Sequence, residues 1–441
     1  MVRSHRKRLL LAPLGIVMSV VLISLLVPTA TGSPVVIQMQ RSIREADRNW
    51  QEAVVQEFNR EHDHIKIELA GGGEGIGYGK LQVLIIAGEA PHIIYQDPNN
   101  LLNMARQGAL VDLKPYLDRE PSNSPFRDFF EVTWSFYTLG NSIYGVALDL
   151  QTQALMYNLD AFNEAGQVEP WPGWTWDDLT AMAKKLTKRP SPDAPPSRWG
   201  IREPQWYHWW STMWHFGGEL VDNWSDPQAF TGDTEEVRRA LRVYQELVRA
   251  GAMSPPGTFG TSGTGGTSIN VVGYGLSAMG LANSLYMQTA IPYGIEFKTN
   301  WNVASLPSGP AGNTAITNAL GWGLVKDSGD TKEAFDVLRY FSGPTSMELA
   351  VQHRRGAVLP HRPTMLRSWL RFNTIPSNCR VLLDALPTSR PLPLIEDSHK
   401  NIVNRAAQDF WRDRISENQA IENMRIGIIS GIEANRSAVI K

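Results

Sequence analysis

Three segments between residues 143 and 179 decide the fold of this chain: Ile143-Tyr144-Gly145-Val146, then Ala154-Leu155-Met156-Tyr157-Asn158-Leu159-Asp160-Ala161-Phe162, then Trp174-Thr175-Trp176-Asp177-Asp178-Leu179. These three segments would rarely occur in this order and with this spacing by chance. The third segment also predicts the start of a helix, because Thr175 is a good N-cap residue and a helical pattern follows it from Trp176 to Leu186.

On the N-terminal side of these segments, short runs that are apolar, or in which apolar and polar residues alternate, are separated by helical patterns. Such runs predict strands, and the 3.6-residue patterns predict helices. The expected elements are a strand at 35–39, a helix through 50–58, a strand at 65–69, a helix at 81–87, a strand at 92–95 and a helix at 101–107. Strands that alternate with helices predict a parallel α/β sheet. Further helices are expected at 235–250, at 332–341 and from 402 to the end.

Length and composition indicate a folded chain with more than one globular unit. The chain has 441 residues, and a prior of about one domain per 150 residues suggests two or three units. Hydrophobic residues make up 42% and charged residues 20%, which is typical of a soluble globular protein and too apolar for disorder. We therefore expect at least two lobes.

The N-terminus has the pattern of a secretory signal. Residues 1–8 carry four basic side chains, an apolar stretch runs from Leu9 to Val27, and the small residues Ala30 and Gly32 fit a cleavage site. The apolar stretch is also long enough to cross a bilayer, so an uncleaved anchor is the alternative. In either case residues 1–32 are expected to place the rest of the chain in the periplasm or at the extracellular face of the cell membrane.

Cysteine usage and net charge limit the covalent links and the classes of partner that we expect for this chain. Cys379 is the only cysteine, which excludes an intrachain disulfide and a lipid carried by a cysteine after the apolar stretch. The formal net charge is −2, and it becomes −6 when residues 1–32, with four basic and no acidic side chains, are removed. A mildly acidic body gives no electrostatic reason to bind nucleic acid or an anionic membrane.

The sequence contains no motif for metal or covalent catalysis. It has no HExxH zinc pattern, no CxxC pair and no GxSxG elbow. The run His62-Asp63-His64 is more typical of a solvated turn than of a metal site. We expect neither a cofactor nor a metal.

Four stretches taken together resemble the family of bacterial extracellular solute-binding proteins (family 1), which includes the maltose, oligosaccharide and glycerol phosphate binders. The three segments quoted above form the strongest stretch. The others are residues 87–94 with 108–113, residues 273–279 with 301–307, and residues 321–323 with 356–360. The family's usual Asp after Pro91 is His92 here. The resemblance covers nearly the whole chain after residue 32.

The resemblance implies an α/β, two-lobed periplasmic-binding-protein fold with a hinge and an interlobe ligand cleft. Lobe 1 is expected at residues 34–147 plus 318–378, and lobe 2 at 148–317 plus 379–441. The implied function is capture of a sugar, a di- or oligosaccharide, and its delivery to the permease subunits of an ABC importer, without enzymatic activity. Closure around the solute would create the shape that the permease reads. We expect a monomer.

A cluster of tryptophans is the first candidate for recognition, because sugar sites combine aromatic faces with planar polar groups that bind hydroxyls. Five of the 15 tryptophans fall between Trp199 and Trp214. If residues 205–216 form a helix, then Trp206, Trp209 and Trp210 share one face. Relatives in the resembled family place ligand-contacting tryptophans in the matching segment. Packing in the core of the second lobe is the alternative.

Three further candidates come from the later stretches. Trp322 lies between Gly321 and Gly323, which would let a ligand approach its ring closely, although a buried strand tryptophan is the alternative. Asn283 stands near a position where relatives carry an aromatic residue, and it would offer a polar contact instead. Arg355 would reach across the cleft with its fixed fork of donors.

Polar candidates also follow two expected strands. Asp97 and Asn99 come after the strand that ends at Tyr95, at the edge where open α/β sheets bind ligands. Asn99 matches a position that is often a ligand-contacting carboxylate in relatives. Asp149 and Gln151 lie at the expected first crossing between lobes. A turn-forming or solvated role is the alternative for each.

Two other functions stay open. The same fold could bind a glycerophosphodiester, a polyol or an amino sugar, and Arg354, Arg355 and Arg390 are then the candidate cations for a phosphate. A secreted glycoside hydrolase would also use aromatic faces with two carboxylates, for which Asp97 and Asp149 are candidates.

Overall fold

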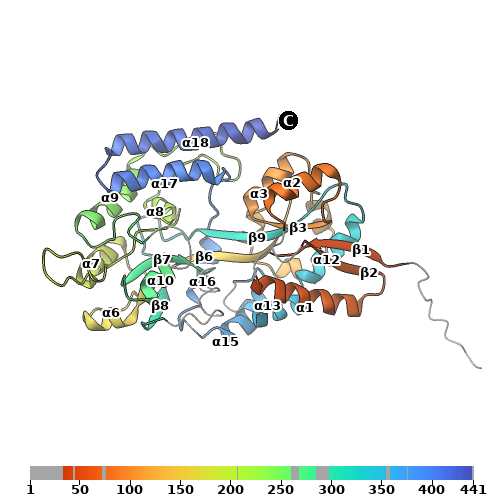
Figure 1. Cartoon of the computed structure of the whole chain (residues 1–441), viewed down its shortest axis with the longest axis horizontal. Helices are drawn as coiled ribbons and strands as arrows, with labels where there is room; N and C mark the ends of the chain where they lie inside the picture. The colour runs from red at the N-terminus through yellow and green to blue at the C-terminus, as the bar shows by residue number, and fades with distance from the viewer. Residues whose placement is uncertain are drawn as a thin grey trace, which may run out of the picture.

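The protein is an elongated molecule of two lobes joined at its centre by the strands β6 and β9 (Figure 1). It is represented by a computed structural model. The model describes residues 33–42, 45–71, 76–205, 207–259, 268–284, 297–353, 358–374 and 376–439. The predicted signal at residues 1–32 therefore lies outside the described residues.

Within the described residues, seven strands form one mixed sheet in the order β2-β1-β3-β9-β6-β7, with β8 also paired to β6. β4 and β5 form a separate ribbon. The strands are β1 Val35–Gln40, β2 Ile65–Ala70, β3 Ile93–Gln96, β4 Thr138–Leu139, β5 Ser142–Ile143, β6 Val146–Asn158, β7 Met279–Asn283, β8 Trp301–Ala304 and β9 Thr317–Leu324.

The sheet is only partly parallel. β1 pairs in parallel with β2 and with β3, as the alternation of strands and helices predicts. β9, β6, β7 and β8 pair antiparallel to their neighbours, so the predicted parallel sheet is wrong for this half. The reason is that β6 runs from the first lobe into the second and β9 runs back, so neither strand closes a βαβ crossover.

β6 serves both lobes. All thirteen of its residues are buried, its first half pairs with β9, and its second half pairs with β7 and β8. Alternate side chains of the second half face opposite sides of the sheet: Leu155 and Tyr157 belong to one hydrophobic core, Ala154 and Met156 to the other. One strand therefore contributes to both cores.

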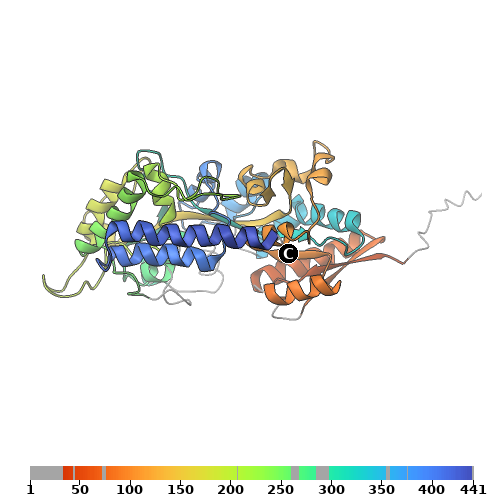
Figure 2. The same ribbon diagram turned by 90° about the horizontal axis from the view of Figure 1, so that it is seen from above.

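The helices cover the two lobes on either side of this strand pair (Figures 1 and 2). Those placed before β6 are α1 Glu45–Glu61, α2 Tyr78–Ala87, α3 Pro98–Arg106, α4 Lys114–Asp118, η1 Pro125–Asp128 and α5 Val132–Ser135. Those between β6 and β9 are α6 Leu159–Glu164, α7 Trp176–Leu186, α8 Trp210–Phe216, α9 Glu235–Arg249 and α10 Ser268–Gly273. Those after β9 are α12 Thr331–Phe341, α13 Pro344–His353, α14 Arg362–Thr364, η2 Met365–Trp369, α15 Leu370–Phe372, α16 Val381–Asp384, η3 Leu386–Thr388, α17 Asp397–Trp411 and α18 Glu417–Val439.

Two hydrophobic clusters correspond to the lobes. The first draws on residues 37–156 and 319–386 and also includes Val272, Ala282 and Val303, and the second draws on residues 155–316 and 395–432. The expected lobe boundaries at 147/148 and 317/318 fall in or beside β6 and β9. The segment 387–394 separates the last residues of the first cluster from the second, later than the expected boundary at 378/379.

α17 and α18 lie side by side along one face of the molecule (Figures 1 and 2). Gly427 and Gly431 of α18 allow a close approach, because an added Cβ would lie about 3 Å from Ile402 and Ile395. α18 extends far enough to contact α3 of the other lobe. The pair therefore forms a contact between the lobes besides β6 and β9.

Most local predictions from the sequence are confirmed. α7 spans Trp176–Leu186, and the Asp178 amide donates to the Thr175 hydroxyl at 3.2 Å. The helix expected from 402 to the end is instead two helices, because the chain turns at Asp413, which has a left-handed φ of 58°.

The pairing of β6 with β9 predicts that substitution of Gly321 lowers the stability of the protein. A Cβ at Gly321 would lie 2.4 Å from the Tyr137 hydroxyl oxygen and 2.7 Å from the Val146 carbonyl oxygen. We expect Gly321→Ala to lower the free energy of unfolding by about 1–3 kcal/mol, measured by urea denaturation. Tyr137→Phe in the same chain should recover part of this loss. Gly79→Ala, which has open space around it, is the control and should be neutral or stabilising.

Candidate binding site

A cavity of about 190 Å³ lies at the carboxyl ends of β1 and β3. Parallel strands end at the same edge of a sheet, and open α/β sheets bind ligands there. β9 closes one side of the cavity with Leu320, and α2 begins at its rim with Tyr78. The lining residues are Gln40, Ile76, Gly77, Tyr78, Tyr95, Gln96, Asp97 and Leu320. The structure thus brings Asp97, predicted from its place after a strand, to a cavity.

Asp97 is fixed by the helix that it caps. Its carboxylate accepts from the Asn100 amide at 3.0 Å, and Pro98 occupies the first position of α3. Burial raises the pKa of Asp97, and the Asp397 carboxylate raises it further, while the Asn100 amide and Lys400 oppose the shift. The position therefore holds a carboxyl group in surroundings that disfavour its charge.

Charged and phenolic groups of the second lobe interact electrostatically with Asp97. Lys400, in the first turn of α17, is only 2% exposed and donates to Asp397 at 3.1 Å. Burial lowers the pKa of Lys400, whereas the carboxylates of Asp397 and Asp97 raise it. Burial raises the pKa of the Tyr207 hydroxyl, as do Asp397 and Asp97. The cavity residue Asp97 is thus coupled electrostatically to ionisable groups of the second lobe.

Sequence reasoning missed Lys400, Asp397 and Tyr207. Tyr207 lies in the sequence beside the predicted tryptophan cluster, and this position was the only sequence feature that could have identified it as a site residue. Asp397 and Lys400 read as the ordinary first turn of a surface helix, and nothing in their local pattern indicates where that helix packs.

The strand that crosses between the lobes carries polar residues at its centre. Its register with β9 shifts between Ala147 and Asp149, and bulges of this kind redirect the side chains that follow. Asp149 is fully buried and accepts from the Leu320 amide at 3.2 Å. Gln151 is 6% exposed, and its amide makes no hydrogen bond within the described part of the chain. Gln151 is therefore available to a ligand.

Two more polar atoms near Asp97 lack a partner among the described residues. Asn99 Oδ1 is buried without a hydrogen bond, and so is the hydroxyl of Tyr137. Burial raises the pKa of Tyr137, and the carboxylates of Asp149 and Asp97 raise it further. Buried polar atoms are almost always paired, so these two unpaired atoms are candidates for contact with a solute.

Trp322 lies in the core of the first lobe. It is 2% exposed, with its ring 5.2 Å from Tyr95 and 6.0 Å from Phe341 between centroids. The flanking glycines do not expose the ring in this structure. Gly321 instead makes room for Tyr137, and Gly323 for Leu101. Contact between Trp322 and a ligand stays a prediction.

Trp209 and Trp210 pack in the core of the second lobe. Each is 1% exposed, and both indole N–H groups donate to Asn404 Oδ1 of α17 at 2.9 Å. The predicted helix at 205–216 is wrong at its start, because α8 begins at Trp210 and residues 207–209 form a turn. In this conformation these two rings support the fold, and a role in ligand contact stays a prediction.

The remaining candidates are placed as follows. Asn283 ends β7, is half-buried and pairs with Gln153 of β6. Trp206 and Arg355 lie outside the described residues.

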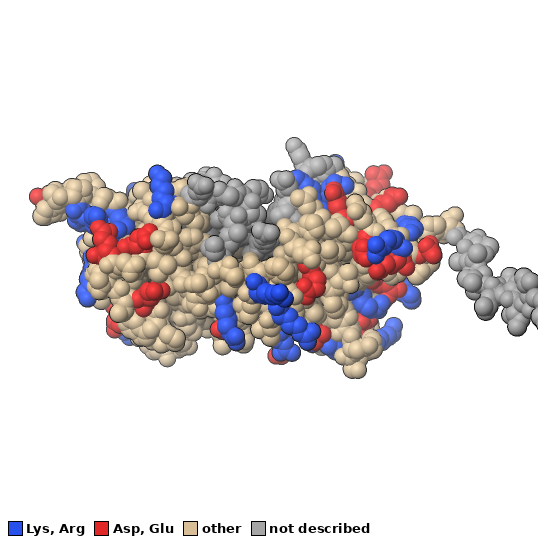
Figure 3. Space-filling view, turned by 90° about the horizontal axis from the view of Figure 1, so that it is seen from below, with Lys and Arg blue, Asp and Glu red and all other residues tan. Residues whose placement is uncertain are grey.

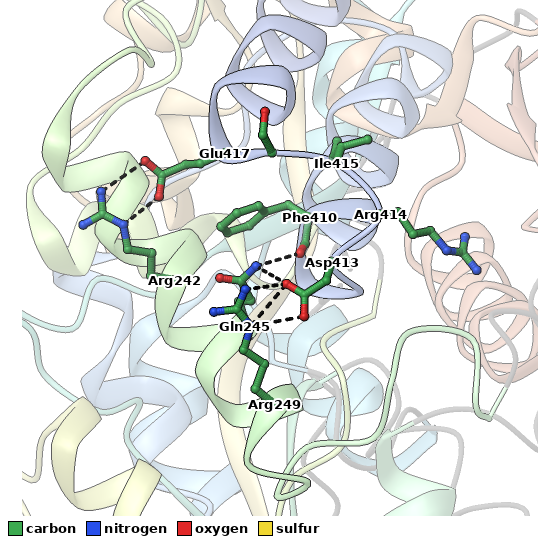
Figure 4. A pocket seen from close by; sticks show the side chains of 9 residues that line it. Arg242, Gln245, Arg249, Phe410, Asp413, Arg414, Ile415 and Glu417 are labelled. Atoms are coloured by element: carbon green, nitrogen blue, oxygen red, sulfur yellow. Dashed lines mark hydrogen bonds and ion pairs between the residues drawn. The ribbon is translucent and has the colours of Figure 1, made fainter.

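A larger hollow of about 630 Å³ lies elsewhere, between α9 and the turn that joins α17 to α18 (Figure 4). Its charges are already paired: Arg242 donates to Glu417 at 2.6 Å, and Arg249 donates to Asp413 at 2.6 Å. These ion pairs lower the pKa values of Glu417 and Asp413. The arrangement ties α9 to the C-terminal helices.

The described residues show neither a metal centre nor a membrane-spanning helix. No group of three or more His, Cys, Asp or Glu side chains among them could hold a metal ion. None of the helices that they form is long and apolar enough to cross a bilayer. On the face drawn in Figure 3, basic and acidic side chains lie beside each other over both lobes, and uncharged residues cover most of the surface.

A family model described as bacterial extracellular solute-binding protein matches residues 41–348. The chain belongs to this family. The resemblance stated from the sequence is confirmed, and membership makes the chain a member of the extracellular solute-binding proteins. Family and neighbours are binding proteins.

One curated relative of this solute-binding protein is an uncharacterized lipoprotein from the oleD 5' region of Streptomyces antibioticus. It is 26% identical over 304 residues, which cover 67% of this chain and 63% of the relative. The chain thus spans slightly less than two thirds of that relative's length.

Solved structures show the two-lobed fold. The sugar-binding protein MalE from Xanthomonas citri has a TM-score of 0.76 at 18% identity, covering 91% of this chain and 98% of that one. UgpB from Mycobacterium tuberculosis in complex with glycerophosphocholine has a TM-score of 0.72 at 16% identity, covering 93% and 100%. The α/β, two-lobed periplasmic-binding-protein fold is confirmed.

The surroundings of Asp97 predict a stability that depends on pH. A carboxyl group whose folded pKa lies above its unfolded value of about 3.9 destabilises the protein at higher pH, and this cost disappears as pH falls below both values. We expect Asp97→Asn to raise the melting temperature at pH 7 and to leave it unchanged near pH 3, because Asn keeps the cap. Asp97→Ala, which loses the cap, should cost about 1 kcal/mol. A melting temperature lowered by Asp97→Asn at pH 7 would contradict the assignment.

The shared acceptor of the two tryptophans predicts a second effect on stability. Asn404→Ala leaves two buried indole N–H donors without a partner, and we expect a loss of about 1–3 kcal/mol in the free energy of unfolding. Asn401→Ala, at an exposed position of the same helix, is the matched control and should stay within about 0.5 kcal/mol. Equal effects of the two substitutions would show that Asn404 is not the acceptor.

Proposed function

We propose that this protein is the extracytoplasmic receptor of an ABC importer, that it captures a di- or oligosaccharide between its lobes, and that it delivers the sugar to the permease subunits. It acts as a monomer and is not an enzyme. Residues 1–32 direct its export, as a cleaved signal or as an anchor. The only cysteine is Cys379, far from the apolar stretch, so no cysteine directly after that stretch carries a lipid.

The observation that carries the proposal is the cavity that Asp97 lines, together with polar groups of both lobes that lie near Asp97 in the chain or interact with it electrostatically. Asn99 follows Asp97 in the first lobe and has an unpaired Oδ1, Gln151 lies on the crossing strand, and Tyr207 and Lys400 of the second lobe interact electrostatically with Asp97. Carboxylate, amide, phenol and ammonium groups together bind the hydroxyls of a sugar, which donate and accept hydrogen bonds. Tyr78 at the cavity rim offers a ring face for C–H groups.

The size of the cavity supports a solute that contacts both lobes. At about 190 Å³ the cavity is smaller than the roughly 300 Å³ at which pockets for drug-sized ligands begin. It holds one part of a di- or oligosaccharide, and the rest meets the second lobe. Closure about β6, β9 and the segment 387–394 then couples capture to the shape that the permease recognises.

A glycerophosphodiester fits the described site less well. Helix N-termini attract phosphate, but Asp97 already occupies the N-terminus of α3 at the cavity. A phosphate placed there would meet a carboxylate.

A thermal-shift screen of residues 33–441 against mono-, di- and oligosaccharides, polyols and glycerophosphodiesters tests the proposal. A ligand at one hundred times its Kd adds about 2.7 kcal/mol of stability, which raises the melting temperature by several degrees. We expect a di- or oligosaccharide to give this shift and to be recovered intact. Recovery of cleaved sugar would establish a glycoside hydrolase, and a shift given only by glycerophosphodiesters would replace the sugar as solute.

A further inference from the structure

Gln96 brings unused hydrogen-bond donors to the cavity at the carboxyl ends of β1 and β3. Its side chain lines the cavity, and the residue is 9% exposed. The side-chain oxygen accepts from Asn100 Nδ2 at 3.1 Å. The side-chain nitrogen carries two N–H groups and makes no hydrogen bond within the described part of the chain. Gln96 therefore offers donors to a solute in this cavity.

The surrounding hydrogen bonds fix which end of the Gln96 amide is free. Asn100 Nδ2 donates to the Asp97 carboxylate at 2.8 Å, and an ionised carboxylate only accepts, so this atom of Asn100 is the nitrogen. The same nitrogen lies 3.1 Å from Gln96, so the Gln96 atom that it meets is the oxygen. The free end of the Gln96 amide is therefore its donor end.

The start of α2 adds backbone donors at the same cavity. Gly77 and Tyr78 line it, and the amides of Tyr78, Gly79 and Lys80 have no partner inside the helix. Gly77 has no side chain to cap them, and the first turn contains no acidic residue. A Cβ added at Gly77 or Gly79 would meet no described atom within 4 Å, so this turn is open to a ligand. Donors from β3 and from α2 thus serve one cavity.

The acceptors that line the cavity are largely committed to the fold. Gln40 Oε1 accepts from the Tyr95 amide at 2.8 Å, and each carboxylate oxygen of Asp97 already accepts from Asn100. The rest of the lining is mostly apolar or aromatic: Ile76, Tyr78, Tyr95 and Leu320. A group that complements this lining presents an oxygen acceptor next to an apolar part.

Among the groups that sugars carry, an acetamido group meets these conditions. A hydroxyl that accepts from Gln96 must also place its own hydrogen, and a buried donor without an acceptor is costly. A carbonyl oxygen accepts two bonds and has no hydrogen to place, and the methyl group beside it suits an apolar wall. A carboxylate or a phosphate would share the cavity with the carboxylate of Asp97, which disfavours a second negative charge.

We propose that the solute contains an N-acetylated amino sugar, whose acetamido carbonyl accepts from Gln96 Nε2 and from the amides at the start of α2. The methyl group of the acetamido then packs against Ile76 and Leu320. This inference rests on the proposed function and names its solute class. Gln96 is the residue that selects an acetamido group over a hydroxyl at the same ring position.

The test compares dimers that share one linkage and differ in one substituent. The full chain, purified after export, is titrated at pH 7 with N,N'-diacetylchitobiose, cellobiose and the chitosan dimer, which carry acetamido, hydroxyl and amino groups at the same ring position. Tryptophan fluorescence and calorimetry are the readouts. We expect diacetylchitobiose to bind at least about tenfold more tightly than either of the other two.

Two variants assign this preference to the cavity. Gln96→Glu keeps an oxygen for Asn100 and replaces the free donors by an acceptor, so it should reduce the preference at least about tenfold. Gly77→Ser supplies a cap for α2, so it should keep or slightly raise the melting temperature while it reduces the preference, because its hydroxyl occupies the amides that the solute needs. Gln107→Glu makes the same change of charge at an exposed position of the first lobe, and this control should leave the preference unchanged.

The outcomes separate this inference from the proposed function. Binding of cellobiose as tight as that of diacetylchitobiose overturns the acetamido group and leaves sugar capture intact. A preference that survives both Gln96→Glu and Gly77→Ser, or that Gln107→Glu reduces as much as Gln96→Glu does, also overturns it, because the acetamido group would then lie elsewhere. If no dimer binds, the inference fails, and the proposed function fails with it only if the wider sugar screen is negative too.

Discussion

The backbone pairing of β6 is the constraint on which the rest of the structure depends. A strand of thirteen residues is about 40 Å long, more than either lobe needs, and every backbone amide and carbonyl along a buried strand requires a partner. β9 supplies the partners in the first lobe, and β7 and β8 supply them in the second. The lobes are therefore joined by a paired ribbon, whose ladder is interrupted at the bulge after Ala147.

The pairing of β6 also distinguishes polar side chains that stabilise the fold from those that remain available to a ligand. Gln153 donates to the His208 carbonyl at 2.8 Å, and the Thr152 amide donates to Ser284 at 3.2 Å, so both hold the second lobe to the strand. Gln151, between Asp149 and these residues, has no such partner in the described chain. The side-chain amide of Gln151 is therefore not required by the fold in the way that the polar groups of Gln153 and Thr152 are, which keeps it a candidate for ligand contact.

Local sequence patterns predicted the elements well and their long-range packing poorly. Thr175 fixes the start of α7 through a bond to its own first turn, and Asp97 could be found because it follows a strand. The burial of Trp209 and Trp210 depends instead on Asn404, nearly two hundred residues later, on a helix that follows the segment 387–394. Lys400 lies on the same helix, which is why neither its burial nor its proximity to Asp97 could be predicted from its neighbours.

Asp97 shows where the requirements of fold and site diverge. The fold needs an N-cap for α3, and Asn serves that purpose as well as Asp. Asn would also avoid the cost of a carboxylate whose charge is disfavoured by burial and by Asp397. The charge of Asp97 therefore gives the helix no stability that an uncharged Asn could not give. The same charge lowers the stability of the folded protein when no ligand is bound. A cost of this kind is expected where a binding site is prepared for a partner of opposite charge or for strong hydrogen-bond donors, because ligand binding then recovers what folding has lost.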